Sequence, residues 1–214
     1  MSDKELYYAA YCILDTQNAD SIITVNGNTV VVGAELHMTP QTHVTERGKE
    51  VDRIVLSRGE MAMGFLPPDT SKQVKKRLDE GWTCRFLTVA AIFDKRSDSF
   101  ATEAVAFCYD PAYESTFEPF IASMEKRIAK GERPVVALSP KELARVIESS
   151  GTWNETKSQK MPKLERGTAY YKTKRTNTEK LALQAASGNK GCYVGLFVVV
   201  FAIIFSIIWF IFLR

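Results

Sequence analysis

Residues 85–109 read RFLTVAAIFDKRSDSFATEAVAFCY, and this stretch decides how the chain folds. Two apolar runs, residues 85–93 and 100–109, flank the polar segment 94–98. Apolar runs of this length, rich in aromatic and small residues and bounded by polar turns, are typical of β-strands. Because so short a connection cannot cross over a sheet, the two strands are predicted to pair antiparallel.

Further strands are expected upstream of this hairpin. Residues 6–14 (LYYAAYCIL) predict a first strand, with a helix as the alternative. Residues 21–33 (SIITVNGNTVVVG) predict a hairpin, because the central Asn-Gly-Asn tolerates the positive φ of a tight turn. Residues 53–66 predict a second hairpin, which Pro67-Pro68 ends since proline has no N–H for a strand ladder. Residues 35–50 are polar without a clear period, and we expect an irregular loop there.

A helix is expected directly after the second hairpin, over residues 69–81. Val74 and Leu78 lie four residues apart and predict one apolar face, and Gly81 is suited to end the helix. The candidate capping residues are Asp69, Thr70 and Ser71. The residues expected to face mostly outward are Lys72, Lys75, Lys76 and Arg77.

Two more helices are expected in the second half of the domain. The first covers residues 117–130, with Pro119 tolerated in its first turn. Its apolar residues recur at spacings of four, three and four, namely Phe117, Ile121, Met124 and Ile128. A short strand over residues 135–138 is expected next. Ser139-Pro140-Lys141-Glu142 then matches a capping box and predicts a helix that ends near Gly151.

These elements predict an α+β fold built on antiparallel hairpins with two or three packed helices. The domain is expected to cover residues 1–151, which is long enough for one hydrophobic core. Residues 152–192 are expected to form a basic, flexible tether, because apolar positions are sparse there.

The apolar stretch 193–213 (YVGLFVVVFAIIFSIIWFIFL) contains no charged residue. As a helix it would be roughly 31 Å long, which matches the hydrocarbon thickness of a bilayer. We therefore expect one transmembrane helix, with a buried core helix as the alternative. The residues expected to mark the span are Tyr193, Phe197, Phe201, Ile204, Ile208, Trp209 and Leu213.

Charge is distributed unevenly along the chain. The whole chain has a net charge of +3, whereas residues 152–192 alone carry nine basic and three acidic residues. Basic residues beside a span favour the cytoplasmic side, so the N-terminal domain is expected in the cytoplasm. The residues expected to meet anionic lipid headgroups are Lys172, Lys174, Arg175, Lys180 and Lys190. The alternative is a linker that only keeps the chain soluble and sets its topology.

The first residues, MSDKELYYAAYCILD, show no signal peptide, so a tail-anchored protein is expected. A glycolipid-anchor signal is the competing interpretation, because residues 185–188 are small, but it requires a secretory signal. The four cysteines (Cys12, Cys84, Cys108 and Cys192) show no metal-type spacing and are expected to be free thiols in a reducing compartment. Cys192 at the membrane edge is a candidate for palmitoylation.

No motif in the sequence predicts catalysis or a cofactor. The two histidines, His37 and His43, have Glu35 and Glu46 nearby, but their spacing matches no metal-ligand pattern. Phosphate-binding glycine loops, nucleophile elbows and zinc-protease motifs are absent from the sequence. We therefore expect no metal and no cofactor, and a membrane-bound enzyme of unknown reaction stays an alternative.

Residues 53–82 (RIVLSRGEMAMGFLPPDTSKQVKKRLDEGW) resemble the centre of a HIRAN domain. Gly64-Phe65-Leu66-Pro67 stands where that family has a Gly-Tyr-Leu-Pro-like motif, and Leu78-Asp79-Glu80-Gly81 closes the helix. The resemblance implies a HIRAN-like core over about residues 22–110 and a small barrel-like sheet. Some members bind the 3′ end of single-stranded DNA. The family's Asn-x-x-Asp stretch is not recognisable before Ile54, so no binding residue is carried over.

The sequence thus predicts a tail-anchored, single-pass membrane protein that presents a cytoplasmic binding or scaffold domain to an unknown protein partner. The alternatives are a HIRAN-like protein that binds single-stranded nucleic acid at a membrane, and the membrane-bound enzyme.

Overall fold

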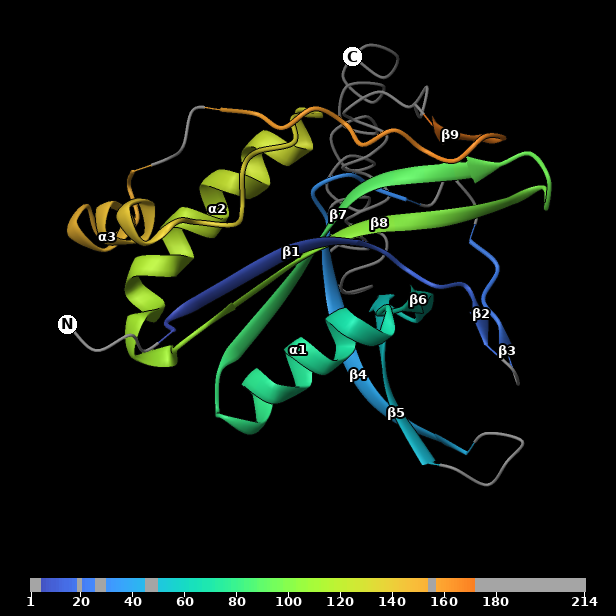
Figure 1. Ribbon diagram of the computed structural model, residues 1–214, viewed down its shortest axis with the longest axis horizontal. Coiled ribbons are helices and arrows are strands. Elements are labelled where there is room, and N and C mark those ends of the chain that lie inside the picture. The colour runs from blue at the N-terminus through green and yellow to red at the C-terminus, as the bar shows by residue number, and fades with distance from the viewer. Residues whose placement is uncertain (1–4, 19–20, 26–29, 45–49, 154–156, 172–214) are drawn as a thin grey trace, which may run out of the picture. The chain divides into compact units, whose positions relative to one another are not determined.

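The computed structural model describes residues 5–18, 21–25, 30–44, 50–153 and 157–171 (Figure 1). By its internal contacts the chain divides into the compact unit Met1–Thr173 and a second unit, Lys174–Arg214. The predicted span and the five basic residues Lys172, Lys174, Arg175, Lys180 and Lys190 lie outside the described residues. Within the described ranges, no helix is long and apolar enough to cross a membrane.

A seven-stranded antiparallel sheet forms the centre of the first unit. Its strands lie in the order β1 (Tyr7–Ile13), β8 (Ser99–Tyr109), β7 (Thr83–Asp94), β4 (Glu35–Val44), β5 (Glu50–Arg58) and β6 (Met61–Phe65). The seventh strand, β9 (Thr168–Tyr171), also pairs with β7, and the short strands β2 (Gln17–Asn18) and β3 (Ser21–Ile22) pair separately. The first predicted strand, the β7–β8 hairpin and the β5–β6 hairpin are confirmed.

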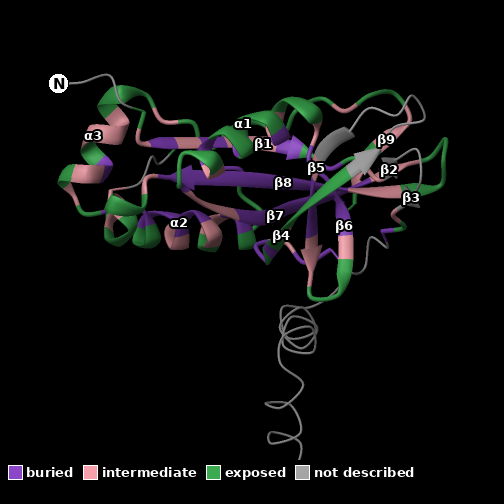
Figure 2. Cartoon of the chain, turned by 90° about the horizontal axis from the view of Figure 1, so that it is seen from below, coloured by how far each residue is buried: buried purple, intermediate pink, exposed green. Residues whose placement is uncertain are grey.

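Helices cover both faces of the sheet. They are α1 (Pro68–Asp79), the 3₁₀ turn η1 (Pro111–Tyr113), α2 (Glu114–Ala129) and α3 (Pro140–Glu148). Successive residues of β8 point to opposite faces. Ala104 and Ala106 accordingly pack in the core on the α1 side, and Val105 and Phe107 in the core on the α2 side. This explains why β8 is buried along most of its length (Figure 2).

The structure confirms the positions of the predicted helices and the apolar face predicted for α2. Phe117, Ile121, Met124 and Ile128 of α2 are all fully buried. Ser139 and Glu142 form the predicted capping box of α3. Two details of α1 are wrong: its N-cap is Pro67 without a side-chain capping bond, and Arg77 is buried rather than exposed. The Arg77 guanidinium lies 3.9 Å from the Tyr8 ring and 2.7 Å from Glu5, which compensates its burial.

The expected barrel-like sheet is not closed. Strands β1 and β6 form the two ends of the sheet order, and a single isolated bridge between Asp15 and Phe65 connects them. A closed barrel would need a ladder at this edge. β6 is only five residues long, and Pro67 follows Leu66 directly after it, so the ladder stops there.

Two predictions for residues 21–50 are wrong. Residues 30–33 are not a strand, and β3 pairs with β2 instead. Val30 and Val31 are buried in the core by a turn, in which Gly33 takes a φ of 84° and donates to Thr88. The expected loop after residue 35 is the strand β4, whose polar residues are mostly exposed and therefore leave no apolar period.

Residues 135–138 form no strand, and an isolated bridge between Pro134 and Ser158 lies just before them. Strand β9 lies inside the range for which the sequence predicts a tether, and it pairs with residues Ala91–Asp94 of β7. The part of residues 152–171 that the structure describes therefore belongs to the domain, so the boundary expected at residue 151 is too early.

The expectation of free thiols is wrong for two cysteines. Cys84 of β7 and Cys108 of β8 are directly opposite each other in the hairpin and form a disulfide, with their Cα atoms 4.1 Å apart. Cys12 is a buried free thiol whose pKa is raised to about 12, chiefly by burial. Cys192 lies outside the described residues.

Candidate anion-binding pocket

The bridge between the two ends of the sheet also positions a pocket. The Asp15 N–H donates to the Phe65 carbonyl at 2.9 Å, and the Phe65 N–H donates to the Asp15 carbonyl at 2.7 Å. Gly64 makes this approach possible, because a Cβ there would lie 2.6 Å from the Leu14 Cβ. Gly64 also has a φ of 142°, which side-chain-bearing residues rarely adopt. The structural role of this glycine is therefore to let β6 meet the end of β1.

Helix α1 begins immediately after this meeting point. The Leu66 N–H donates to the Ile54 carbonyl of β5, and Pro67 and Pro68 then turn the chain into the helix. Proline at the first helical position costs no hydrogen bond, because that N–H has no partner inside a helix. The side chains of the first two turns of α1 are thereby placed next to Asp15 and to Arg53 of β5.

A cavity of about 250 Å³ lies at this junction. Its walls combine an apolar floor with three basic side chains, one carboxylate and one hydroxyl. The lining residues are Asp15, Arg53, Leu66, Pro68, Ser71, Lys72 and Lys75. Pockets for whole drug-sized ligands are typically about 300 to 1,000 Å³, so this cavity suits one chemical group of a larger ligand.

The pocket has an excess of uncompensated positive charge. Among the described residues, neither Arg53 nor Lys72 forms an ion pair. The Arg53 guanidinium lies 5.7 Å from the centre of the Phe65 ring, which holds it at the pocket without neutralising it. Lys75 and Asp15 both have interactions of their own. Arg53 and Lys72 are thus the cations that a bound anion would meet.

Ser71 adds a hydrogen-bonding group at the base of the pocket. The residue is 8% exposed, and its backbone N–H donates to Pro67. Within the part of the chain that the structure describes, its hydroxyl has no hydrogen-bond partner. The hydroxyl oxygen is not one of the fully buried polar atoms that lack a partner, so it keeps access to solvent and can donate a hydrogen bond to a ligand oxygen.

The described lining residues offer positive charge and hydrogen-bond donors to a ligand. Among the described lining residues, Asp15 is the single carboxyl and none is a histidine or a cysteine. Ser71 has no base within hydrogen-bonding distance among the described residues, so nothing there activates its hydroxyl. The charge of the described lining residues favours an anionic group over a cationic one.

The histidines lie elsewhere, on β4. His37 is exposed and pairs with Ser57 of β5 in the sheet register, and His43 lies near the far end of the same strand. In the described ranges, no three His, Cys, Asp or Glu residues come close enough to hold a metal ion.

No family model, no curated protein and no solved structure matches this chain. The HIRAN-like resemblance of residues 53–82 therefore stays a prediction, and the case for the pocket rests on its geometry.

The sequence did not single out these pocket residues as a group. It placed Lys72 and Lys75 on the outer face of a helix and Arg53 at the start of a predicted hairpin, and it gave no role to Asp15. One signal was present: Ser71, Lys72 and Lys75 are spaced so that they share a helix face. The meeting of Asp15 with β6 depends on long-range strand pairing, which local patterns do not show.

Proposed function

We propose that this chain is a membrane-tethered binding module whose domain holds an anionic group of its ligand in the pocket at the start of α1. The observation that supports this most directly is that one cavity is lined by the Ser71 hydroxyl and by Arg53 and Lys72, two cations that form no ion pair among the described residues. A planar guanidinium, an ammonium and a hydroxyl together match the oxygens of a phosphate group.

Asp15 narrows the chemistry of the ligand further. A carboxylate in a basic pocket would repel a bare anion, but it accepts hydrogen bonds from hydroxyl or N–H groups. Sugar phosphates and nucleotides carry such donors close to a phosphate. A ligand of this type can pair its phosphate with the basic residues and its hydroxyl or N–H groups with Asp15. The shared chemistry is a phosphate next to a hydrogen-bond donor.

The membrane part of the proposal rests on the sequence of residues 193–213, which is apolar and long enough to span a bilayer. The basic residues between 152 and 192 favour a cytoplasmic domain. The Cys84–Cys108 disulfide favours an oxidising compartment instead, so these two observations point to opposite sides of the membrane. We propose the cytoplasmic side because the charge asymmetry acts during insertion itself.

A second candidate is recognition of a single-stranded nucleic acid, which would supply the same phosphate chemistry. This candidate is supported by where the pocket lies in the sequence. Leu66 and Pro68 of the pocket belong to, or directly follow, the Gly64–Pro67 motif on which the HIRAN-like resemblance rests. Nucleic-acid affinity would fall steeply with salt concentration, because bound counterions are released.

Binding of defined probes to the full chain in detergent micelles tests the proposal. The probes are inorganic phosphate, a deoxynucleoside monophosphate and a short single-stranded oligonucleotide. A pocket for small phosphorylated ligands binds the mononucleotide at least as well as the oligonucleotide. A nucleic-acid site prefers the oligonucleotide, with strong salt dependence.

A matched pair of variants separates the pocket from general electrostatic attraction. Lys72→Gln removes a lining cation and is expected to weaken binding about tenfold, the usual scale of a hydrogen bond to a charged group. Lys76→Gln removes the same charge from the same helix, but Lys76 lies outside the pocket and pairs with Glu80 at 3.9 Å. Equal losses in both variants, or no binding of any probe, would contradict the proposal.

A further inference from the structure

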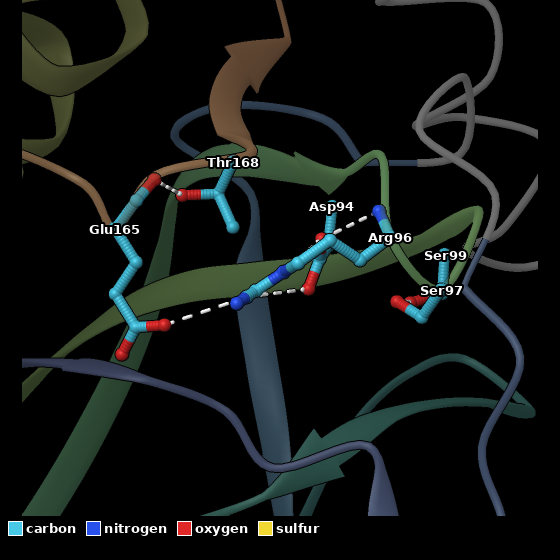
Figure 3. Close-up of polar contacts among 6 residues, drawn as sticks. All are labelled: Asp94, Arg96, Ser97, Ser99, Glu165 and Thr168. Atoms are coloured by element: carbon cyan, nitrogen blue, oxygen red, sulfur yellow. Dashed lines mark hydrogen bonds and ion pairs between the residues drawn. The ribbon is translucent and has the colours of Figure 1, made fainter.

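A second surface of the domain lies where the chain leaves the sheet, at the β7–β8 turn and β9. Figure 3 shows how the two segments are joined: the Arg96 guanidinium contacts the Asp94 carboxylate at 3.0 Å and reaches Glu165 at 3.4 Å. The Lys95 N–H donates to the Gly167 carbonyl, and the Thr168 hydroxyl donates to the Glu165 carbonyl. These contacts fix residues 165–168 on the turn.

The pairing leaves the surface with unpaired positive charge. Arg96 engages both Asp94 and Glu165, so two of the local carboxylates are already neutralised. Asp98 is the remaining acidic residue of the turn. Lys95 of the turn and Arg166 next to Gly167 are exposed and form no ion pair among the described residues. Lys160 and Lys163, on the segment that leads to residues 165–168, are exposed as well and form no ion pair there. The surface is therefore a cationic one.

Exposed apolar side chains accompany these cations. Met161 is 42% exposed and Tyr171 is 36% exposed, and they are two of only four large hydrophobic residues exposed in the described part of the chain. The Tyr171 ring packs edge-on against Phe100 with ring centres 5.1 Å apart, and the Tyr170 hydroxyl donates to the carbonyl of Pro162, which follows Met161. Amphipathic aromatic side chains of this kind are typical of membrane interfaces.

In the sequence, this surface is followed by the predicted anchor. Strand β9 ends at Tyr171, and the predicted span begins at Tyr193, so 21 residues separate them. Twenty-one residues can reach at most about 75 Å when fully extended. Along the chain, β9 is the described strand nearest to the predicted span.

We propose that this hairpin surface, made of Lys95, Lys160, Met161, Lys163, Arg166 and Tyr171, lies on the bilayer and binds anionic lipid headgroups. The cations attract the headgroups, and the two apolar side chains enter the interfacial region. The proposal rests on the membrane anchor of the proposed function, and it is independent of the α1 pocket. It assigns the folded domain an orientation on the membrane.

The test uses the full chain reconstituted in lipid nanodiscs, either of phosphatidylcholine alone or with added phosphatidylserine. Hydrogen exchange is measured for peptides that cover residues 94–99 and 157–171. The expected result is exchange about tenfold slower in the anionic discs than in the neutral ones. Peptides from α2 should exchange equally in both, which also reports that the domain is folded.

Charge-reversal variants identify the residues responsible. The variant K160E/K163E/R166E is expected to lose the lipid-dependent protection. The control K126E/K130E/K141E reverses three exposed charges on and beside α2 and α3 and is expected to keep it. The proposal would be overturned if the protection from hydrogen exchange did not depend on the lipid, or if both variants lost it equally. The surface would then be a candidate site for a protein partner.

Failure of the anchor gives a different result from failure of the surface. If the chain does not co-elute with the discs, the anchor is refuted. Sedimentation of the same chain with vesicles of the two compositions then decides the surface proposal. Binding to the anionic vesicles that the K160E/K163E/R166E variant loses would support it, and equal or absent binding would overturn it.

Discussion

Arg133 donates to the carboxylate of Glu103 across 30 residues of chain, and both side chains are buried. The guanidinium also stacks on the Tyr11 ring at 3.8 Å, and the Tyr11 hydroxyl donates to the Pro134 carbonyl at 2.7 Å. The pair therefore ties the segment after α2 to β1 and β8. The second oxygen of Glu103 is buried without a hydrogen-bond partner among the described residues.

Removing one member of this pair is expected to be far more harmful than removing both. Arg133→Met leaves the Glu103 carboxylate buried without its cation, which typically costs about 3 to 5 kcal/mol of the free energy of unfolding. The double variant R133M/E103Q removes both charges and is expected to recover much of that loss. Chemical denaturation followed by tryptophan fluorescence measures the difference. Additive losses in the double variant would show that the two side chains are not coupled.

The same carboxyl predicts a pH dependence. Burial is the largest effect on Glu103 and raises its pKa above the usual value, although Arg133 acts in the opposite direction. The folded state then holds this proton more tightly than the unfolded state. Its stabilising contribution is present below the unfolded-state pKa and is lost as the pH rises through the raised folded-state pKa. The free energy of unfolding of the wild type, relative to Glu103→Gln, should therefore fall with rising pH in that window, and a rise would contradict the assignment.

Gly151 is expected to tolerate no side chain. It follows α3 with a φ of 80°, and a Cβ there would lie 2.0 Å from the Thr116 carbonyl oxygen of α2. Gly131 is the matched control, because its φ is 83° and a Cβ would meet nothing within 4 Å. Gly131→Ala should cost about 1 kcal/mol of stability through its backbone alone. Gly151→Ala should cost about 1 to 3 kcal/mol more through the clash. Thermal unfolding measures the stability of both variants. Equal losses of stability would refute the close approach of Gly151 to α2.

The Cys84–Cys108 disulfide is expected to stabilise the β7–β8 hairpin. It encloses 24 residues by sequence separation, for which loop-closure arguments give about 3 kcal/mol. A reducing agent should lower the melting temperature of the wild type and leave that of C84A/C108A unchanged. Counting free thiols by mass spectrometry on protein taken directly from cells then tests the side of the membrane. Oxidised Cys84 and Cys108 would contradict a cytoplasmic domain.

Much of the fold follows from local patterns, where those patterns reflect burial. The apolar runs of β7 and β8 and the spacing of Phe117 and Ile121 in α2 predict their elements correctly, because each of these faces is in the core. β4 was missed because its residues are mostly polar and exposed, so that hydrogen bonds to β5 and β7 define the strand while apolar periodicity does not.

The remaining differences arise from long-range contacts. β9 pairs with a strand more than 70 residues earlier in the chain, and the sequence of its four residues does not indicate which strand it pairs with. Val30 and Val31 looked like half of a hairpin, yet they fill the core from a turn. The pocket was missed for the same reason, since Asp15 reaches α1 only through its bridge to Phe65.

The central claim is that Arg53, Lys72 and Ser71 bind a phosphate group. The most direct measurement is a titration of the full chain with inorganic phosphate, followed by the amide resonances of the domain. The account predicts saturable shifts that are largest at Ser71 and Lys72 and that vanish in the R53Q/K72Q variant. Shifts that are absent, that continue linearly without saturation, or that cluster instead around Lys160 and Lys163 would contradict it.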